Sequence, residues 1–518
     1  MVGVGELIEL IESVAYNSGK GRDELESGDF MAKKPNIVLI MADQFRYDAI
    51  HAHGNEFIST PTLDQFVRTG IDFSNAYSAT PTCVPARASL LSGLSQKNTG
   101  IVGYAEGANW NFPTLLGEAF SSIGYYAKAV GKMHVSPPRK LCGFHHIDLH
   151  DGYLHATRNT HKQVRQSYEQ TDDYFHWLKQ QVNHPIDLND SGLDCNSWVA
   201  RPFPYEERLH PTNWATEKAI DFLRWRDPEM PFFLKLSYVR PHSPLDPPSH
   251  YFDMYMDIFK EISHEDFSTW AKEMGLEVPV DTVDSLSGTL SMIDYKRLLA
   301  GYYGLVTQID HQINRFLIHL QENQLLEDTI IVFTSDHGDQ LGEHALYRKG
   351  YPYQGSIHIP FIIVDPGANI ATKDKLKTKV DDIVELRDVL PTLIDLTQQA
   401  SIPDVDGCSI KPILFKQHTK EWRDYLHGEH ILGDYSSQFI LKDDWKYIWF
   451  TQTNTEQLFN LKVDPKERQD LSAEEPQQVS LLRGLLIDEL DGRPEGFVSH
   501  KQLVAGRKQK PLIQEDLF

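Results

Sequence analysis

Pro35-Asn36-Ile37-Val38-Leu39-Ile40-Met41-Ala42 is the stretch from which the fold of this chain can be predicted. The run is mostly apolar and shows no alternation with polar residues, which is typical of a strand buried on both faces of a parallel sheet. Three later runs have the same character: Tyr125 to Val130, Pro231 to Tyr238 and Thr329 to Ser335. We therefore expect these four segments to form the centre of one large sheet.

Segments with helical character lie between these strands. Thr60 followed by Pro61 is typical of a helix N-terminus. The other expected helices are Phe112 to Ser122, Gln163 to Gln181, Thr212 to Trp225, Tyr295 to Leu326 and Asp381 to Gln398. Ile357 to Val364 is expected to be a further strand. Strands that alternate with helices predict an α/β fold with a large, mostly parallel sheet sandwiched by helices.

The chain changes character after Asp404. Short strands are expected at Gln438 to Leu441, Trp445 to Phe450 and Gln457 to Leu461, followed by a helix near Gln478 to Leu490. This order predicts a smaller C-terminal subdomain with an antiparallel sheet and a helix. Because 518 residues are many for one core, we expect a catalytic domain over residues 31–403 and the subdomain over 404–518. Residues 1–30 are expected to be an extension or leader outside the fold.

Polar side chains follow two of the predicted central strands. Asp43 and Gln44 come directly after the first strand, and Asp336 and His337 come directly after Thr329 to Ser335. In open α/β sheets, ligands gather at the carboxyl ends of the strands. Two carboxylates with an amide oxygen suit a hard divalent cation. The four residues therefore predict a metal site, although each alone could be an ordinary turn or capping residue.

A cysteine stands at the predicted start of a helix in Thr82-Cys83-Val84-Pro85-Ala86-Arg87-Ala88-Ser89-Leu90-Leu91-Ser92-Gly93. Pro85 suits a first helical turn, and that end of a helix favours an anionic group beside Cys83. Arg87 lies one turn further and points back toward the same end. A buried structural thiol with a solvated arginine would explain these residues equally well, so other motifs must decide.

Basic residues follow two further strands. Lys132 and His134 alternate after Tyr125 to Val130, so an extended backbone would project both to one side. His242 lies between Pro241 and Pro244, and these prolines restrict the backbone that orients the imidazole. Taken singly, a lysine or a histidine in a loop is usually solvated.

Together these motifs resemble the formylglycine-dependent sulfatases of the alkaline phosphatase superfamily. Cys83, Pro85 and Arg87 match the Cys-x-Pro-x-Arg signature that a formylglycine-generating maturation enzyme reads when it oxidises the cysteine. The resemblance runs from about Pro35 to about Leu471 and includes Gly-Lys-x-His at 131–134, Pro-His-x-Pro at 241–244 and a lysine loop at 342–350. Within that loop Lys349 is the match. Methionine replaces the common tryptophan at position 133, and His358 stands where many relatives have arginine.

The resemblance implies an alkaline phosphatase-like fold and a sulfate-ester hydrolase of the arylsulfatase type. It implies one divalent cation, usually calcium, bound by Asp43, Gln44, Asp336, His337 and the modified residue 83. A histidine ligand is softer, so magnesium or manganese stays possible. The expected substrate is a sulfated sugar or a small organic or aryl sulfate. No residue can be assigned to substrate specificity.

The resemblance also implies a role for each basic residue. The sulfuryl group would move to a hydrated formylglycine at Cys83, with Arg87 and the metal stabilising the attacking oxygen. Lys132 and Lys349 would hold the sulfate oxygens. His242 would protonate the leaving alcohol, and His134 would accept a proton from the second hydroxyl.

Two alternatives stay open. Gln44 together with His337 also resembles the phosphonate monoester and phosphodiester hydrolases of the same superfamily, although Lys132 and His134 favour sulfate. The second alternative is a catalytically inactive, carbohydrate-binding relative.

Composition excludes several classes of protein. The net charge of -23 and the lack of basic clusters argue against a nucleic-acid partner. With 41% hydrophobic and 24% charged residues the chain is typical of a globular protein. No run approaches the ~20 apolar residues of a membrane span, and no signal peptide is visible, so we expect a cytoplasmic protein. The four cysteines show no disulfide or zinc pattern.

Overall fold

The computed structural model describes residues 34–152, 172–186, 191–261, 268–276, 278–397, 404–417 and 422–513. The extension expected at 1–30 lies outside these residues, and so do the first part of the helix expected at Gln163 to Gln181 and the last residue of the one expected at Asp381 to Gln398. The second part of the helix expected at Gln163 to Gln181 is α7 (Asp173–Gln181). Among the helices of the described ranges, none has both the length and the apolar composition that a bilayer span requires.

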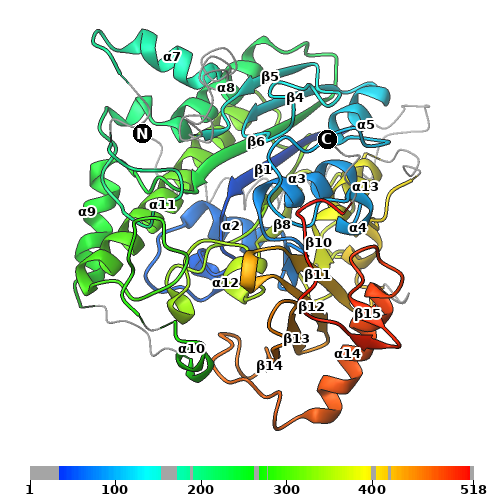
Figure 1. Ribbon diagram of the computed structural model, residues 1–518. Helices are drawn as coiled ribbons and strands as arrows, with labels where there is room; N and C mark the ends of the chain where they lie inside the picture. Colours follow the sequence, from blue (N-terminus) through cyan, green and yellow to red (C-terminus); the bar gives the residue numbers. More distant parts are fainter. Residues whose placement is uncertain are drawn as a thin grey trace.

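An eight-stranded sheet forms the centre of the molecule, with the strand order β5-β4-β6-β1-β7-β8-β2-β9 (Figure 1). Its strands are β1 (Asn36–Asp43), β2 (Ile71–Phe73), β4 (Tyr126–Gly131), β5 (His146–Leu149), β6 (Phe232–Pro241), β7 (Thr329–Ser335), β8 (Phe361–Val364) and β9 (Lys379–Val380). β1 pairs in parallel with both β6 and β7, and β4 pairs in parallel with β6. β8 runs antiparallel to both β7 and β2, so the sheet is mixed but mostly parallel. The four predicted central strands are confirmed.

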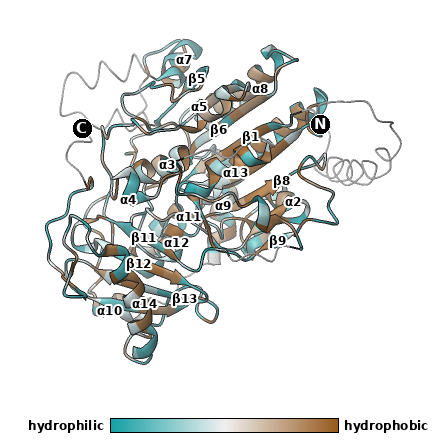
Figure 2. Ribbon diagram, turned by 90° about the vertical axis from the view of Figure 1, so that its right-hand side faces the viewer, coloured by the Kyte–Doolittle hydropathy of each residue, from teal (hydrophilic) through white to brown (hydrophobic). Residues whose placement is uncertain are grey.

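The central strand β1 shows why its sequence does not alternate. Val38 and Ile40 belong to the hydrophobic core on one face of the sheet. Ile37 and Leu39 belong to the core on the other face. Because successive side chains point to opposite faces, both sets must be apolar. Figure 2 shows the same property as hydrophobic colouring along β1 and β6.

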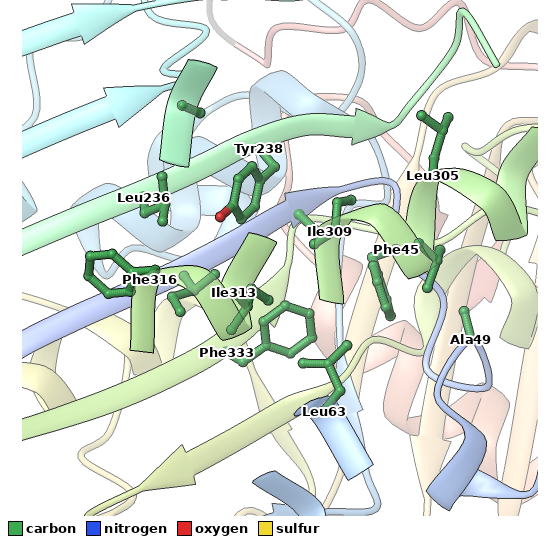
Figure 3. Packing of buried hydrophobic residues seen from close by; sticks show 14 of the residues in the cluster. Phe45, Ala49, Leu63, Leu236, Tyr238, Leu305, Ile309, Ile313, Phe316 and Phe333 are labelled. Carbon is green, nitrogen blue, oxygen red and sulfur yellow. The ribbon is translucent and has the colours of Figure 1, made fainter. Parts of the chain in front are cut away.

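Helices cover both faces of this sheet. On the first face lie α2 (Pro61–Thr69), α8 (Pro211–Trp225), α9 (Ser249–Ile258) and α11 (Met292–Glu322). Ile313 and Phe316 of α11 lie against Leu236 of β6 and Phe333 of β7 (Figure 3). Burial of one such side chain contributes about 1.5–3 kcal/mol. The second face carries α3 (Cys83–Ser92), α5 (Leu116–Ser122) and α13 (Val389–Leu396).

A second sheet lies in the C-terminal part, at the lower end of the molecule in Figure 1. It is antiparallel in the order β11 (Leu426–His430), β12 (Ser437–Lys442), β13 (Trp445–Phe450) and β14 (Glu456–Asn460). One face packs on α14 (Pro476–Leu490), and the other packs on residues from the preceding part of the chain, including Tyr353. The predicted sheet and helix are confirmed, and the boundary at residue 404 stays a prediction.

The remaining short elements connect these layers. They are β3 (Ala76–Tyr77), α4 (Gln96–Thr99), α10 (Thr269–Glu273), α12 (Gln354–Ile357), β10 (Val384–Glu385), β15 (Val498–Ser499) and β16 (Gln502–Leu503).

Three predicted elements begin too early. The helix expected from Asp381 starts at Val389, because Val384 and Glu385 pair with β3 instead. The helix expected from Phe112 starts at Leu116, after an extended Leu115. The strand expected from Ile357 starts at Phe361, directly after Pro360, which cannot donate a ladder hydrogen bond.

Candidate active site

Two buried carboxylates lie side by side at the carboxyl ends of β1 and β7. These strands pair in parallel up to Ala42 and Ser335, so Asp43, the last residue of β1, and Asp336, the residue after β7, lie at the same edge of the sheet. Gln44 has a positive φ of 68°, and its backbone N–H donates to Asp336 Oδ1 at 3.2 Å. The parallel pairing therefore brings together two residues that are far apart in sequence.

Cys83 reaches the same edge from the first residue of α3. Its Sγ lies 3.2 Å from His337 Nε2, 3.7 Å from Asp43 Oδ1 and 3.5 Å from Lys132 Nζ. Asp43, Cys83, Asp336 and His337 each place one potential ligand atom within 4.8 Å of the others, and all four are buried. Two carboxylates that lie this close together, beside an imidazole, fit a divalent cation.

Arg87 joins both carboxylates to the neighbouring loop. Its Nε donates to Asp336 Oδ2 at 2.8 Å, its Nη2 to Asp43 Oδ2 at 3.3 Å, and its Nη1 to the Lys132 carbonyl oxygen at 3.0 Å. Lys132 forms an ion pair with Asp43 as well. Two fixed cations thus flank Cys83, which is the arrangement that would bind an oxyanion.

Lys349 and His242 form a second basic pair. The Lys349 ammonium donates to Gln44 Oε1 at 2.7 Å and contacts His242 Nε2. His242 Nδ1 donates to the Ser243 carbonyl oxygen at 2.8 Å, so the other ring nitrogen, Nε2, is the one that faces Lys349. The backbone N–H of His242 donates to the Asp43 carbonyl oxygen at 3.1 Å. Because the Gln44 side chain is engaged by Lys349 here, Gln44 as a metal ligand stays a prediction.

His134 is buried beside the cluster with incomplete hydrogen bonding. Its backbone N–H donates to Asp151 Oδ1 at 2.9 Å and its φ is 55°. Nε2 lies 3.5 Å from Glu106 Oε2, and neither ring nitrogen completes a hydrogen bond with the described residues. A buried polar atom without a partner is costly, which favours a role for this ring toward a ligand.

The electrostatics of the cluster are those of a positive pocket. Burial alone would raise the pKa of the Cys83 thiol, but Lys132, Lys349 and His337 hold it well below its ordinary value. Burial would likewise raise the pKa of Asp43, and the cations around it keep it low. Burial and the nearby Lys349 lower the pKa of His242. For His134, burial is outweighed by Cys83 and Glu106, which raise its pKa.

Four residues that sequence reasoning left unassigned support this arrangement. Asp339 contacts the Gln44 amide, and Asp151 accepts from the backbone of His134. Lys235 donates to the Lys132 carbonyl oxygen at 2.9 Å, and His430 Nε2 lies 3.0 Å from Thr82 Oγ1. Asp339 stands close to Asp336 in the sequence and could have been considered. No local signal points to Lys235 or His430.

Family models agree with these observations. A model of the sulfatase family matches residues 35–399. A model of the C-terminal part of N-sulphoglucosamine sulphohydrolase matches residues 342–490. The first of these spans more than half of the chain and includes every residue of the cluster around Cys83.

Individual proteins resemble the chain over most of its length. An arylsulfatase of Clostridium perfringens is 49% identical over 477 residues, which are 91% of this chain and 98% of that protein. A structure solved in complex with its substrate D-glucosamine-2-N,6-O-disulfate has a TM-score of 0.67 at 22% identity, covering 88% of this chain and 98% of its own. A phosphonate monoester hydrolase from Silicibacter pomeroyi has a TM-score of 0.69 at 21% identity, covering 92% and 100%. At these identities the two structures show a shared fold.

Proposed function

The chain belongs to the sulfatase family and is a sulfuric ester hydrolase, and on that premise we propose that its reaction takes place at Cys83 with the residues around it. The alkaline phosphatase-like fold expected of the family is present. One observation carries the proposal: segments remote in sequence converge on the Cys83 sulfur and place cations around it.

Residue 83 and one divalent cation complete the proposed site. The family implies that Cys83 is converted to formylglycine by a maturation enzyme, so that Sγ marks the position of the reactive oxygen. Asp43, Asp336, His337 and residue 83 would hold the cation, with Gln44 as a further ligand. We propose calcium, with magnesium or manganese as alternatives. A bound divalent cation supplies charge stabilisation to an oxygen nucleophile.

The basic residues are proposed to bind and orient the sulfate group. Arg87 forms ion pairs with both carboxylates, and its charge interacts with residue 83. The ammonium groups of Lys132 and Lys349 would contact the sulfate oxygens, where negative charge increases in the transition state. His242 Nε2 would donate a proton to the leaving alcohol. Burial and the Lys349 charge both lower the pKa of His242, and a sulfate beside Lys349 would offset the second of these effects.

His134 is proposed to accept a proton in the second half of the reaction. Its ring is buried beside Cys83, with Nε2 3.5 Å from Glu106 Oε2. Its pKa is raised by Cys83 and Glu106 despite burial, which favours retention of the proton once accepted.

An aryl sulfate is the first proposed substrate, because the relative at 49% identity is named an arylsulfatase. Sulfated sugars and other small organic sulfates are further candidates. A phosphonate ester is the second candidate function, favoured by the combination of Gln44 and His337. The structurally similar phosphonate monoester hydrolase is 21% identical to this chain and is thus a more distant relative than the arylsulfatase at 49%.

The test is a parallel assay on an aryl sulfate, defined sulfated mono- and disaccharides, and a phosphonate monoester. We expect sulfate-ester turnover to dominate and to fall by about 10³-fold or more in Cys83→Ala, while the protein stays folded. Full turnover in Cys83→Ala would contradict the mechanism. Mass spectrometry of protein from its native host should show a converted residue 83, and an unmodified thiol there would favour the inactive relative.

A further inference from the structure

Gln44 differs from the carboxylates of the proposed metal-binding set, because its two ends are not equivalent. An amide has an oxygen acceptor at one end and two N–H donors at the other, and only the oxygen can bind a cation or accept from an ammonium group. Gln44 is fully buried, and its Oε1 accepts from Lys349 Nζ at 2.7 Å. A second contact must therefore hold the amide in this orientation.

Asp339 makes that contact at the other end of the amide. Gln44 Nε2 donates to Asp339 Oδ2. A carboxylate offers acceptors only, so it pairs with the N–H end of the amide and not with the oxygen. Because Nε2 is engaged by Asp339, Oε1 is the atom that faces Lys349.

The Asp339 carboxylate is itself held in place by the backbone of its loop. Its Oδ1 accepts from the backbone N–H groups of Leu341 at 2.8 Å and Arg348 at 2.9 Å. Both donors belong to residues in the left-handed region, with φ of 48° and 65°, which residues other than glycine seldom adopt. One carboxylate oxygen thus holds the loop, and the other contacts Gln44.

The same carboxylate reaches Lys349 by a second route. Arg348, whose N–H group Asp339 accepts, is the residue directly before Lys349. The backbone N–H of Gln340 donates to the Arg348 carbonyl oxygen at 2.7 Å, so this part of the loop is fixed from both sides. Asp339 therefore holds the backbone beside the lysine and also orients the amide that receives the lysine ammonium group.

We propose that Asp339 is a positioning residue, which turns the oxygen of the Gln44 amide toward Lys349 and the cation site. The orientation follows from contacts within the chain and does not depend on the reaction. Its consequence for cation binding rests on the function proposed above, in which Gln44 is a further ligand. Without Asp339 an N–H donor of Gln44 could face Lys349 and the cation, and both contacts would then be repulsive.

An exchange of the two side-chain types tests this role. In Asp339→Asn the oxygen of residue 339 is still needed by the N–H groups of Leu341 and Arg348, so its N–H end faces Gln44. Gln44 must then turn its own oxygen toward residue 339 and an N–H group toward Lys349. In the double variant Gln44→Glu/Asp339→Asn, residue 44 can accept from both sides at once, and the net charge of the protein is unchanged.

Thermal unfolding in the presence of a chelator measures the orientation without any cation. We expect Asp339→Asn to lower the unfolding temperature by about 2 °C or more, because two donors then oppose each other in a buried site. The double variant should recover most of this loss. Gln44→Glu alone should also lower the unfolding temperature, because two buried carboxylates then face each other. Asp424→Asn, at a side chain that is 72% exposed, is the control and should cause no change.

Calorimetric titration of the metal-free protein with Ca²⁺, and separately with Mg²⁺ and Mn²⁺, measures the consequence for cation binding. Asp339→Asn should bind the preferred ion at least about tenfold more weakly than the wild type, because an oxygen ligand is replaced by a donor. The double variant should bind it at least as tightly as the wild type, because carboxylate oxygens suit these ions. Asp339→Ala is the matched control: it also removes the acceptor of the two loop N–H groups, so Gln44→Glu should not rescue it.

Three results would overturn the proposal: an unchanged unfolding temperature in Asp339→Asn, no recovery in the double variant, or an unchanged unfolding temperature in Gln44→Glu. If Asp339→Asn does not fold, Gln44→Glu tests the same contact with the native carboxylate in place. A wild type that binds none of the three cations would contradict the metal site proposed above, whereas the unfolding experiment would still decide the orientation of Gln44.

Discussion

Lys349 depends on its neighbours for its position, because it lies in a loop rather than in a helix or strand. Gln44 holds its ammonium group, and His242 lies in contact with it. The side chain can therefore act in two ways: it brings a positive charge to the sulfate, and it lowers the pKa of the proposed acid, His242, in addition to the effect of burial.

Replacement of Lys349 by methionine removes this charge with little change in volume. We expect kcat/KM for an aryl sulfate to fall by about 10²–10³-fold, because one donor to the transition-state charge is lost. The alkaline limb of the pH–rate profile, where His242 as the proton donor loses its proton, should move to higher pH, because Lys349 no longer lowers its pKa. Lys379→Met, at an exposed lysine, is the control. An unchanged kcat/KM would show that Lys349 does not contact the substrate.

The donor set around Cys83 predicts a dependence on divalent cations. Treatment with a chelator should abolish turnover, because Asp43 and Asp336 then lose the cation proposed to compensate them. It should also lower the unfolding temperature, because a bound ion stabilises the folded state. Re-addition of calcium, magnesium or manganese, each alone, identifies the ion that restores activity. Full turnover of protein shown by elemental analysis to be metal-free would contradict the metal site.

At the scale of elements, α11 does more than cover the sheet. Asp310 of this helix accepts hydrogen bonds from the backbone N–H groups of Thr62 at 3.2 Å and Leu63 at 2.8 Å. These groups belong to the first turn of α2, whose N-cap residue Thr60 makes no side-chain cap bond. Two backbone N–H groups at the start of α2, which have no partner within that helix, thus donate to a side chain of α11.

Asp310 makes stability depend on pH in a defined direction. Burial raises the pKa of Asp310 to about 7, above its value of ~3.9 in an unfolded chain. The folded state then binds the proton more tightly, so this group's stabilisation is complete below about pH 4 and is lost as the pH rises through 7. In Asp310→Asn the side chain cannot ionise, so the variant should not lose this stabilisation as the pH rises.

Urea unfolding of the wild type and of Asp310→Asn at pH 4.5 and pH 8 tests this assignment. The free energy of unfolding of the variant, relative to the wild type, should rise between these pH values by about 3 kcal/mol. Equal changes with pH in the two proteins would show that Asp310 ionises normally in the folded state.

At the scale of the whole molecule, the C-terminal sheet contacts the segment that leads to Cys83. The backbone N–H of Glu429 on β11 donates to the Ala79 carbonyl oxygen at 2.8 Å, and the next residue, His430, bonds to Thr82 beside Cys83. Behind this strand, Arg493 holds the Glu429 carboxylate with two bonds of 2.8 and 2.9 Å, both side chains being buried.

Loss of Arg493 should therefore affect both stability and activity. Arg493→Met leaves the Glu429 carboxylate buried without its partner, which should lower the free energy of unfolding at pH 7 by about 3–5 kcal/mol. Turnover should fall as well, since β11 positions Thr82 through His430. The double variant Glu429→Gln/Arg493→Met removes the isolated charge and should recover much of the stability. Wild-type stability in the single variant would show that the pair contributes little.

The sequence by itself determined the features that depend on local pattern. Apolar runs such as Ile37 to Ala42 predicted buried strands, because a strand with both faces in the core cannot alternate. The residues at the ends of these strands, together with the motif around Cys83, predicted a set of side chains that the structure brings close together. Starts of elements were less certain: Val389 begins its helix late because Glu385 pairs with a distant strand.

Only the tertiary structure decided which distant residues meet. Thr82 and His430 are 348 positions apart, and Gln44 and Asp339 are 295 apart. The order of strands and the packing of the C-terminal sheet bring them together, and no periodicity in the sequence encodes these separations. A cavity of about 700 Å³ lined by Arg46, Glu343 and Leu461 has the same origin, because its wall is assembled from segments that share no local signal. Local propensity acts over a few residues, whereas burial and pairing act across the whole chain.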